Sequence, residues 1–208
     1  MKEYYTVRAA AEIEFTEKRS RFIGRCFPAA TEEEALATLA ALRRQHYDAT
    51  HNCYAYAVGE LGDIARFSDD GEPGGTAGLP MMEVLKKRGV TFALVVVTRY
   101  FGGILLGAGG LVRAYSRAAS EAVAAAGVVC RRYTPLFSLT VPYPLWGMVE
   151  SMLRSKAYPY SADYAECVRA VVCVPPEEES AFPAACVELT NAAITPVLCG
   201  REFREWDV

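Results

Sequence analysis

An acidic, glycine-rich segment contains the first residues whose types and spacing could do chemistry. Phe67–Gly78 reads FSDDGEPGGTAG and brings the carboxylates of Asp69, Asp70 and Glu72 close together. Carboxylate oxygens bind divalent cations, and paired acids can act as general acid and base. The spacing matches no EF-hand loop, Asp-Gly is a strong turn signal, and adjacent side chains usually point apart. We therefore rank a structural turn above a metal site.

A glycine-dense turn is the second such segment. Its glycines, all within Val97–Arg117, are Gly102, Gly103, Gly107, Gly109 and Gly110. A strand, a tight turn and a helix start leave free backbone N–H groups at one point, which favours anions. The GxGxxG pattern fails at its sixth position, Val112, and no Gly-Lys-Ser/Thr follows, so nucleotide binding is not supported. Generic anion binding stays open, as does a role in packing and chain reversal alone.

Cationic and aromatic side chains accompany this turn. Arg99 precedes it, and Arg113 and Arg117 follow it on the expected helix, so guanidinium groups could join the backbone N–H groups around a phosphate. Tyr100 and Phe101 are candidates for stacking on bases. We expect the turn to pack against the acidic segment.

Nucleophilic catalysis has weaker support. No serine lies in a GxSxG elbow, and the seven cysteines form no CxxC pair and no zinc-like spacing with His46 or His51. Both histidines are interpreted as loop or cap residues. The odd number of cysteines, scattered through apolar segments, indicates reduced, buried thiols. We therefore predict a binding protein without a catalytic residue, a metal or a cofactor.

Charge and composition limit the kinds of partner. The 208 residues carry a formal net charge of −3, with 52% hydrophobic and 23% charged residues, as in an ordinary globular protein. Residues 1–129 are neutral and residues 130–208 mildly acidic. Nucleic-acid binding would therefore need a local basic patch. No signal-like segment and no membrane-length apolar run is present, which predicts a soluble, cytoplasmic protein with no membrane partner.

The elements that must position the two segments follow from apolar periodicity. Up to the glycine turn we expect strands at about 11–16, 22–27, 52–58, 64–67 and 92–97, and helices at 31–46 and 81–88. Thr31 and Glu34 form a capping box at the first helix start. A further helix at 109–126 should bury Leu111, Tyr115, Ala118, Ala119 and Ala122.

A second pattern begins after a linker predicted at Arg131–Pro135. Strands are expected at 136–141, about 164–174 and 195–206, with helices opening at Pro144 and Pro176. We interpret residues 136–208 as strand-helix-strand-strand-helix-strand, the ferredoxin-like arrangement. This part of the chain contains no motif of its own.

Three motifs together carry a family resemblance. RSRFIG at Arg19–Gly24, FSDDGEPGGTAG at Phe67–Gly78 and RYFGGILLGAGGLVRAY at Arg99–Tyr115 resemble the IMPACT family, including its bacterial YigZ-like members. The resemblance implies an α+β fold, with a ribosomal protein S5 domain 2-like domain at 1–130 and a ferredoxin-like domain at 136–208. That pair is similar to the fourth and fifth domains of elongation factor G, which implies contact with the ribosome or RNA. The resemblance also implies that the family's eukaryotic members regulate translation by competing for an activator of an eIF2α kinase. They carry an additional N-terminal domain that is not expected in this sequence, so that partner is not carried over.

The resulting hypothesis is a non-catalytic RNA- or ribosome-associated regulator of translation, with a translation-related protein as a further partner. The binding residues would be Arg99, Tyr100, Gly102, Gly103, Gly107, Gly109, Gly110, Arg113 and Arg117, with a second loop of Asp69, Asp70, Glu72, Gly74 and Thr76. The alternative is a small metal-assisted enzyme acting on a phosphate-containing or other anionic substrate at the same two loops. A third interpretation is a protein-docking module whose motifs specify the fold alone.

Overall fold

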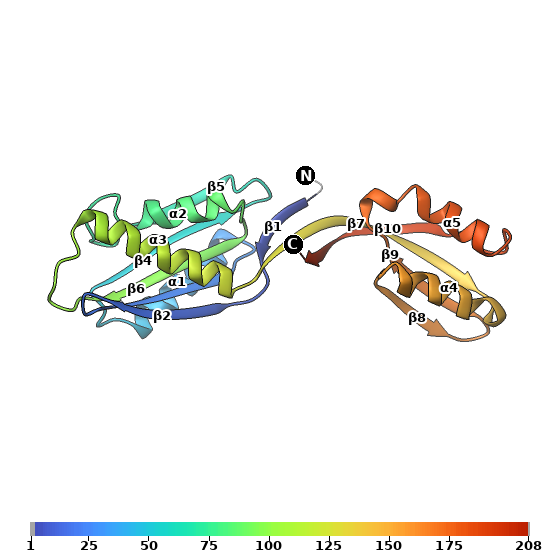
Figure 1. The fold of residues 1–208 in the computed structure, drawn as a ribbon, viewed down its shortest axis with the longest axis horizontal. Coiled ribbons are helices and arrows are strands. Elements are labelled where there is room, and N and C mark those ends of the chain that lie inside the picture. Colours follow the sequence, from blue (N-terminus) through green and yellow to red (C-terminus); the bar gives the residue numbers. More distant parts are fainter. Residues whose placement is uncertain (1–2, 208) are drawn as a thin grey trace. The chain divides into compact units, whose positions relative to one another are not determined.

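The chain forms two compact units. The computed structural model describes residues 3–207. The first unit comprises Glu3–Arg131 together with Trp206 and Asp207, and the second comprises Arg132–Glu205 (Figure 1). Each unit has its own hydrophobic core. No helix among the described residues is long and apolar enough to cross a membrane.

An antiparallel sheet is the centre of the first unit. Its strand order is β2-β3-β6-β4-β5, and every neighbouring pair is antiparallel. The strands are β2 (Ala11–Glu17), β3 (Ser20–Pro28), β4 (His51–Val58), β5 (Ile64–Ser68) and β6 (Ala93–Tyr100). The central strand β6 is buried from Ala93 to Val97, as its continuous apolar run predicted, and Thr98 and Arg99 are buried as well. β1 (Glu3–Val7) lies outside this sheet, and the carbonyl of Tyr5 accepts from the N–H of Thr91 at 2.9 Å.

Helices cover both faces of this sheet (Figure 1). The helices are α1 (Glu32–Gln45), α2 (Gly78–Lys87) and α3 (Ala108–Ala125). Side chains alternate along β6, so Val95 and Val97 pack in the core under α2 and α3, whereas Leu94 and Val96 pack against α1. The sheet therefore separates two apolar layers, and each β6 side chain belongs to one of them.

Local sequence signals account for the helix boundaries. The Thr31 hydroxyl accepts from the N–H of Glu34 at 3.3 Å, and the Glu34 carboxylate accepts from the N–H of Ala30 at 2.8 Å, so the expected capping box is present with Ala30 as the returning donor. The five α3 residues expected to face inward are all buried. Pro80 lies in the first turn of α2, although this helix begins at Gly78, earlier than the predicted start at residue 81.

The second unit has the element order strand-helix-strand-strand-helix-strand. Its elements are β7 (Val128–Val141), α4 (Tyr143–Ser155), β8 (Tyr160–Tyr164), β9 (Val168–Cys173), the short 3₁₀ helix η1 (Pro176–Glu178), α5 (Ala181–Leu189) and β10 (Val197–Asp207). β9 lies between β7 and β8 and is antiparallel to both, and β10 pairs with β7. The architecture of the chain is thus mixed α+β with antiparallel sheets.

Three sequence predictions need correction. The linker predicted at Arg131–Pro135 is part of the continuous strand β7, because Pro135 lacks only an N–H and its carbonyl still accepts from the N–H of Val174 at 3.1 Å. The single strand predicted at 164–174 is wrong: a turn at 165–167 separates β8 from β9. Five cysteines are buried as expected, but Cys199 is exposed and Cys167 half-buried.

Candidate functional site

The acidic segment and the glycine turn meet at one cavity of the first unit. The cavity has a volume of about 340 Å³. Its wall comprises Gly71, Glu72 and Pro73 from the acidic segment, Phe101 and Leu105–Ala108 from the glycine turn, Leu111 of α3, and Thr50, His51 and Arg99. The two segments therefore face the same cavity.

A buried ion pair joins the two segments. Arg99 Nη1 donates to Glu72 Oε1 at 2.6 Å, and the side chains of both residues are at least 95% buried, with exposed fractions of 5% and 2%. The Tyr115 hydroxyl donates to the same oxygen at 2.7 Å, and Arg99 Nη2 donates to Ser20 Oγ at 3.2 Å. Such a pair is held in place by the large cost of leaving either charge alone in the interior.

One donor of this cluster is left over. Arg99 Nε is buried and has no hydrogen-bond partner within residues 3–207. The guanidinium carbon lies 5.4 Å from the centre of the Phe22 ring and 5.5 Å from that of Phe101, which is cation–π contact with both rings. Arg99 is therefore fixed in position while one of its N–H groups remains unsatisfied.

Strand register explains why these residues meet. Arg99 pairs across the sheet with His51 of β4 on one side and with Phe22 of β3 on the other, so the three form a row on one face. His51 Nδ1 lies 2.8 Å from the carbonyl oxygen of Asp70, which can only accept, and this assigns the proton to Nδ1. His51 Nε2 then faces Glu72 Oε1 at 3.8 Å.

Asp69 and Asp70 point apart, as expected for neighbouring residues. Asp69 accepts from the N–H groups of Gly75, Ala77 and Gly78 at 2.8–2.9 Å, at the start of α2. Burial raises the pKa of the Asp69 carboxyl, but these three donors outweigh it and hold the pKa below its ordinary value. Asp70 accepts from Arg43 Nη2 at 2.9 Å and from the Asn52 N–H at 2.6 Å.

These contacts leave the acidic segment without a set of metal ligands. Among residues 3–207, no group of three or more His, Cys, Asp or Glu side chains could hold a metal ion. Thr76 is also engaged, since its buried hydroxyl donates to the Pro73 carbonyl at 2.6 Å, while an added Cβ at Gly74 would meet open space. The carboxylates of the segment are therefore used to hold the loop, α2 and Arg99 in place.

The five glycines of the turn have different surroundings. A Cβ at Gly102 would lie 2.1 Å from the backbone of Arg19, so the close approach of two backbones requires glycine there. A Cβ at Gly110 would lie 3.0 Å from Leu106. Gly103, Gly107 and Gly109 are exposed, and Gly107 precedes α3 at φ +73° without capping it through a side chain. The turn is therefore not deeply buried, whereas deep burial would have favoured the protein-docking module.

Tyr100 lies on the opposite face of the sheet from Arg99, because successive residues of β6 alternate. Its hydroxyl is 2.9 Å from His46 Nδ1, and His46 Nε2 is 2.8 Å from Arg25 Nη2. Burial and the nearby charge of Arg25 lower the pKa of His46. Tyr100 therefore belongs to a separate polar network beside α1 and does not join Arg99 in one patch.

Arg113 and Arg117 line a second, smaller cavity between α3 and the β2–β3 hairpin. Its volume is about 240 Å³, and Lys18 and Glu17 of the hairpin also line it. Arg117 stacks over the Phe15 ring at 4.2 Å and pairs with Glu121 at 2.8 Å. Lys18 and Arg113 form no ion pair in the described part of the chain. This surface, defined by Lys18, Arg113 and Arg117, is called the basic groove below.

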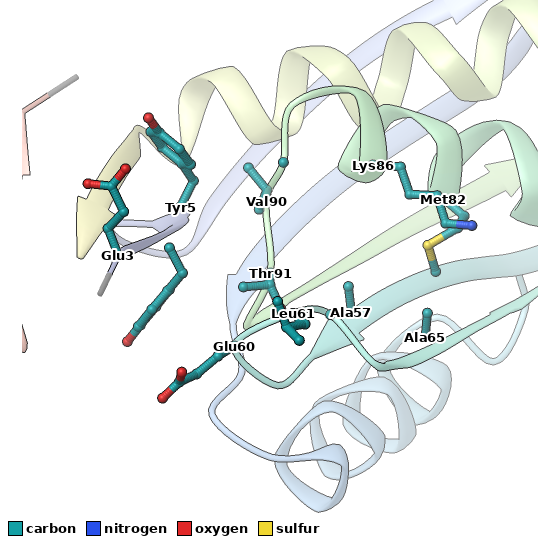
Figure 2. Close-up of a pocket in the computed structure, with 13 residues that line it drawn as sticks. Glu3, Tyr5, Ala57, Glu60, Leu61, Ala65, Met82, Lys86, Val90 and Thr91 are labelled. Atoms are coloured by element: carbon teal, nitrogen blue, oxygen red, sulfur yellow. The ribbon is translucent and has the colours of Figure 1, made fainter. Parts of the chain in front are cut away.

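A third cavity, shown in Figure 2, contains none of the residues expected to bind. It has a volume of about 360 Å³, with Glu3 and Tyr5 on one side and Met82 and Lys86 on another. The Thr91 hydroxyl in its wall donates to the Gly59 carbonyl at 2.5 Å. We therefore place the candidate site at the cavity beside Arg99 and at the basic groove.

Sequence reasoning missed several residues of these sites. His51 was interpreted as a loop or cap residue, and the cavity residues Thr50, Leu105 and Leu106 were not singled out. Lys18 was likewise not singled out. One local signal was available: side chains alternate along β6, and this places Arg99 and Tyr100 on opposite faces of the sheet.

The fold and the site define an α+β protein of two units in which a glycine turn and an acidic loop are joined by a buried Arg–Glu pair. Residues 18–123 match the Impact N-terminal domain. The chain belongs to the IMPACT family, as its three motifs predicted.

Relatives match most of the chain. IMPACT family member YvyE of Bacillus subtilis is 44% identical over 189 residues, 90% of this chain and 87% of the relative. IMPACT family member YigZ of Escherichia coli is 36% identical over 182 residues, covering 85% and 88%. Protein IMPACT of Oryctolagus cuniculus is 38% identical over 102 residues, 46% of this chain and 31% of that protein. The crystal structure of a hypothetical protein is similar with a TM-score of 0.61 and 31% identity, covering 97% of this chain and all of that one.

Proposed function

We propose that the protein is a non-catalytic RNA-binding regulator of translation that associates with the ribosome and contacts RNA phosphates through the basic groove. The translation role rests on family membership, since the resemblance to the IMPACT family implies it; 46% of this chain aligns with Protein IMPACT of Oryctolagus cuniculus. A role at the ribosome would place the protein in the cytoplasm, where a translation-related protein would be a further partner.

The observation that carries this proposal is the clustering of cations on the basic groove. Lys18, Arg113 and Arg117 line it together with one carboxylate, Glu17, and Arg117 is also paired with Glu121 beside the groove. The unit as a whole has no excess of positive charge. The groove borders the start of α3, where no side chain caps the first N–H groups. Free N–H groups and the positive end of the helix dipole favour phosphate.

Two further features support contact with nucleic acid. Phe101 is 45% exposed and Leu105 81% exposed beside the same helix start, which offers apolar surface for unstacked bases. In the sheet ordered β1-β7-β9-β8, β10 also pairs with β7, and the pairing of β10 and β9 with β7 and of β8 with β9 supports our assignment of a ferredoxin-like domain to residues 136–208. For residues 1–130 we propose a ribosomal protein S5 domain 2-like domain, in keeping with the likeness to elongation factor G.

Binding of a labelled single-stranded RNA over a range of salt concentrations tests the proposal, together with co-sedimentation with ribosomes at low salt. The logarithm of the binding constant should fall linearly with the logarithm of salt concentration, by about 0.7 per phosphate contacted. Lys18→Gln and Arg113→Gln should each weaken binding and reduce that slope by about 0.7. Arg117 is kept unchanged because its stacking on Phe15 also supports the fold.

Arg44→Gln is the matched control, because Arg44 is exposed on α1, which covers the other face of the sheet. It removes the same charge and should leave the salt slope unchanged. Absence of RNA and ribosome binding at low salt, binding independent of salt, or an equal effect of Arg44→Gln would each refute the proposal.

A further inference from the structure

The cavity beside Arg99 and the basic groove adjoin at the start of α3. Leu106 lines both of them. The first turns of α3 continue both walls, with Gly107, Ala108 and Leu111 on the cavity and Gly110, Arg113 and Ala114 on the groove. A ligand long enough to pass the Leu106 side chain can therefore occupy the cavity and the groove together.

The cavity and the groove suit different chemical groups. Cations outnumber carboxylates on the basic groove, and Lys18 and Arg113 form no ion pair in the described part of the chain. The Arg99–Glu72 pair contributes no net charge to the cavity. The apolar part of the cavity wall consists of Pro73, Phe101, Leu105, Leu106 and Leu111. A nucleotide has the same division, because its phosphate is anionic whereas its base is neutral and has apolar faces.

The cavity wall matches both the faces and the edge of a base. Its volume of about 340 Å³ lies within the range of small-molecule sites, about 300–1,000 Å³. Phe101 is 45% exposed in this wall, so its ring is available for stacking on a base. Thr50 is exposed and His51 half-buried in the same wall, which leaves hydrogen-bonding groups for the edge of the base. An aliphatic side chain of a protein partner would use only the apolar part.

Glycine keeps the passage between the cavity and the groove open. Gly109 is exposed and follows Ala108 of the cavity wall and precedes Gly110 of the groove wall. A Cβ at Gly109 would meet the end of the Arg113 side chain at 3.7 Å, and one at Gly107 would meet no atom within 4 Å. A sugar-phosphate chain can therefore pass close to the protein backbone at this point.

We propose that the cavity beside Arg99 takes in one unpaired base of a single-stranded RNA whose phosphates lie on the basic groove. This inference rests on the proposed function and adds its substrate class. A duplex has the same phosphates, but its bases are paired and stacked, so it does not present a base to the cavity. Single strands should therefore be preferred.

Three oligomers of equal length separate the contribution of the base from that of the phosphates: a single-stranded RNA, its duplex, and a ribose-phosphate chain without bases. Fluorescence anisotropy at one salt concentration should show that the single strand binds about tenfold more tightly than either comparison. The single strand and the base-free chain should have the same salt dependence, because their phosphates are the same. Absence of binding by all three would refute the proposed function itself. Binding of the single strand no tighter than that of the base-free chain or the duplex would overturn this inference alone, and would leave the cavity to a side chain of a protein partner.

Ala108→Leu tests the location of the base without disturbing the buried pair. Ala108 is exposed at the first position of α3 and lines the cavity, so a larger side chain takes up space there while the cations of the groove remain. Binding of the single strand should weaken about tenfold, to the level of the base-free chain, whose own binding should not change. Ala124→Leu makes the same change at an exposed position near the other end of α3 and should bind the single strand like the unaltered protein. Equal binding by both variants would place the base elsewhere and refute the assignment.

Discussion

Replacing Glu72 with glutamine removes one charge from the buried pair and keeps the side-chain shape. The carboxylate is 2% exposed and receives Arg99 Nη1 at 2.6 Å and the Tyr115 hydroxyl at 2.7 Å. Without it the Arg99 guanidinium, with a side chain only 5% exposed, lacks its counter-charge in the interior. Breaking a buried pair in this way costs about 3–5 kcal/mol, so the first unit of Glu72→Gln should be destabilised by about that amount.

The assay must read the two units separately. Urea unfolding followed by pulse-labelling hydrogen exchange does so, because peptides from α3 report the first unit and peptides from α4 report the second. The first transition should move to lower urea concentration in Glu72→Gln while the second stays in place. Glu83→Gln is the control, since Glu83 is exposed on α2 and its neutralisation should change stability by less than about 0.5 kcal/mol.

A double-mutant cycle separates the pair from other effects of the substitution. Arg99→Met removes the charge that Glu72→Gln leaves alone, so the double variant should be more stable than the sum of the single effects by about 2 kcal/mol. A loss no larger than that of Glu83→Gln, or strictly additive single effects, would refute the view that Glu72 neutralises a buried Arg99.

Three further predictions concern the elements around the site. Asp69→Asn should lower the free energy of unfolding by about 1–3 kcal/mol in urea denaturation. In the unaltered protein both carboxylate oxygens accept from backbone N–H groups, whereas in the variant an amide nitrogen, which cannot accept, replaces one of these oxygens. Gly102→Ala should cost about 1–3 kcal/mol in the same assay, since its Cβ would lie 2.1 Å from backbone atoms of the β2–β3 hairpin. Because the pKa of His46 is lowered in the folded protein, the unfolded chain binds more protons around pH 6.5. The free energy of unfolding should therefore decrease as the pH falls below that value. His46→Gln should make this dependence on pH weaker in denaturation curves between about pH 7 and 5.

Matched variants decide the first two cases. Asp63→Asn changes an exposed aspartate and should be nearly neutral, and Gly74→Ala adds a Cβ where no atom lies within 4 Å. If either control is as destabilising as its partner, the assigned contact is not the cause. An unchanged pH slope in His46→Gln would mean that other groups, such as Asp69 at lower pH, account for the acid sensitivity.

Much of the local structure could be predicted because its causes lie within a few residues. The capping box at Thr31, the buried face of α3 and the continuous burial of β6 follow from spacing alone. The errors occur where the local structure depends on pairing with a strand from a distant part of the chain. Residues Arg131–Pro135 resemble a linker by composition, yet they continue a strand whose hydrogen bonds come from elsewhere in the chain.

The segments that form the candidate site could be predicted, but the role of each residue could not. Residue types and spacing predicted binding residues in the acidic segment and the glycine turn, and at Arg99, Arg113 and Arg117 beside them. Arg113 and Arg117 do line the basic groove, whereas Arg99 lies inside the unit and Tyr100 on the other face of the sheet. Charge and residue type do not distinguish a surface arginine from one that neutralises a buried carboxylate.

The sequence by itself determined the family, the start of α1 and the apolar faces, since motifs, caps and periodicity are encoded within short stretches. Only the tertiary structure decided that Arg99 pairs with Glu72, that Asp69 and Asp70 hold the loop, and that His51 joins the cavity. The reason is that these contacts depend on the register in which His51, Arg99 and Phe22 are aligned across three strands. Register and face are set by pairing between distant segments, and a slip by one residue would exchange Arg99 with Tyr100.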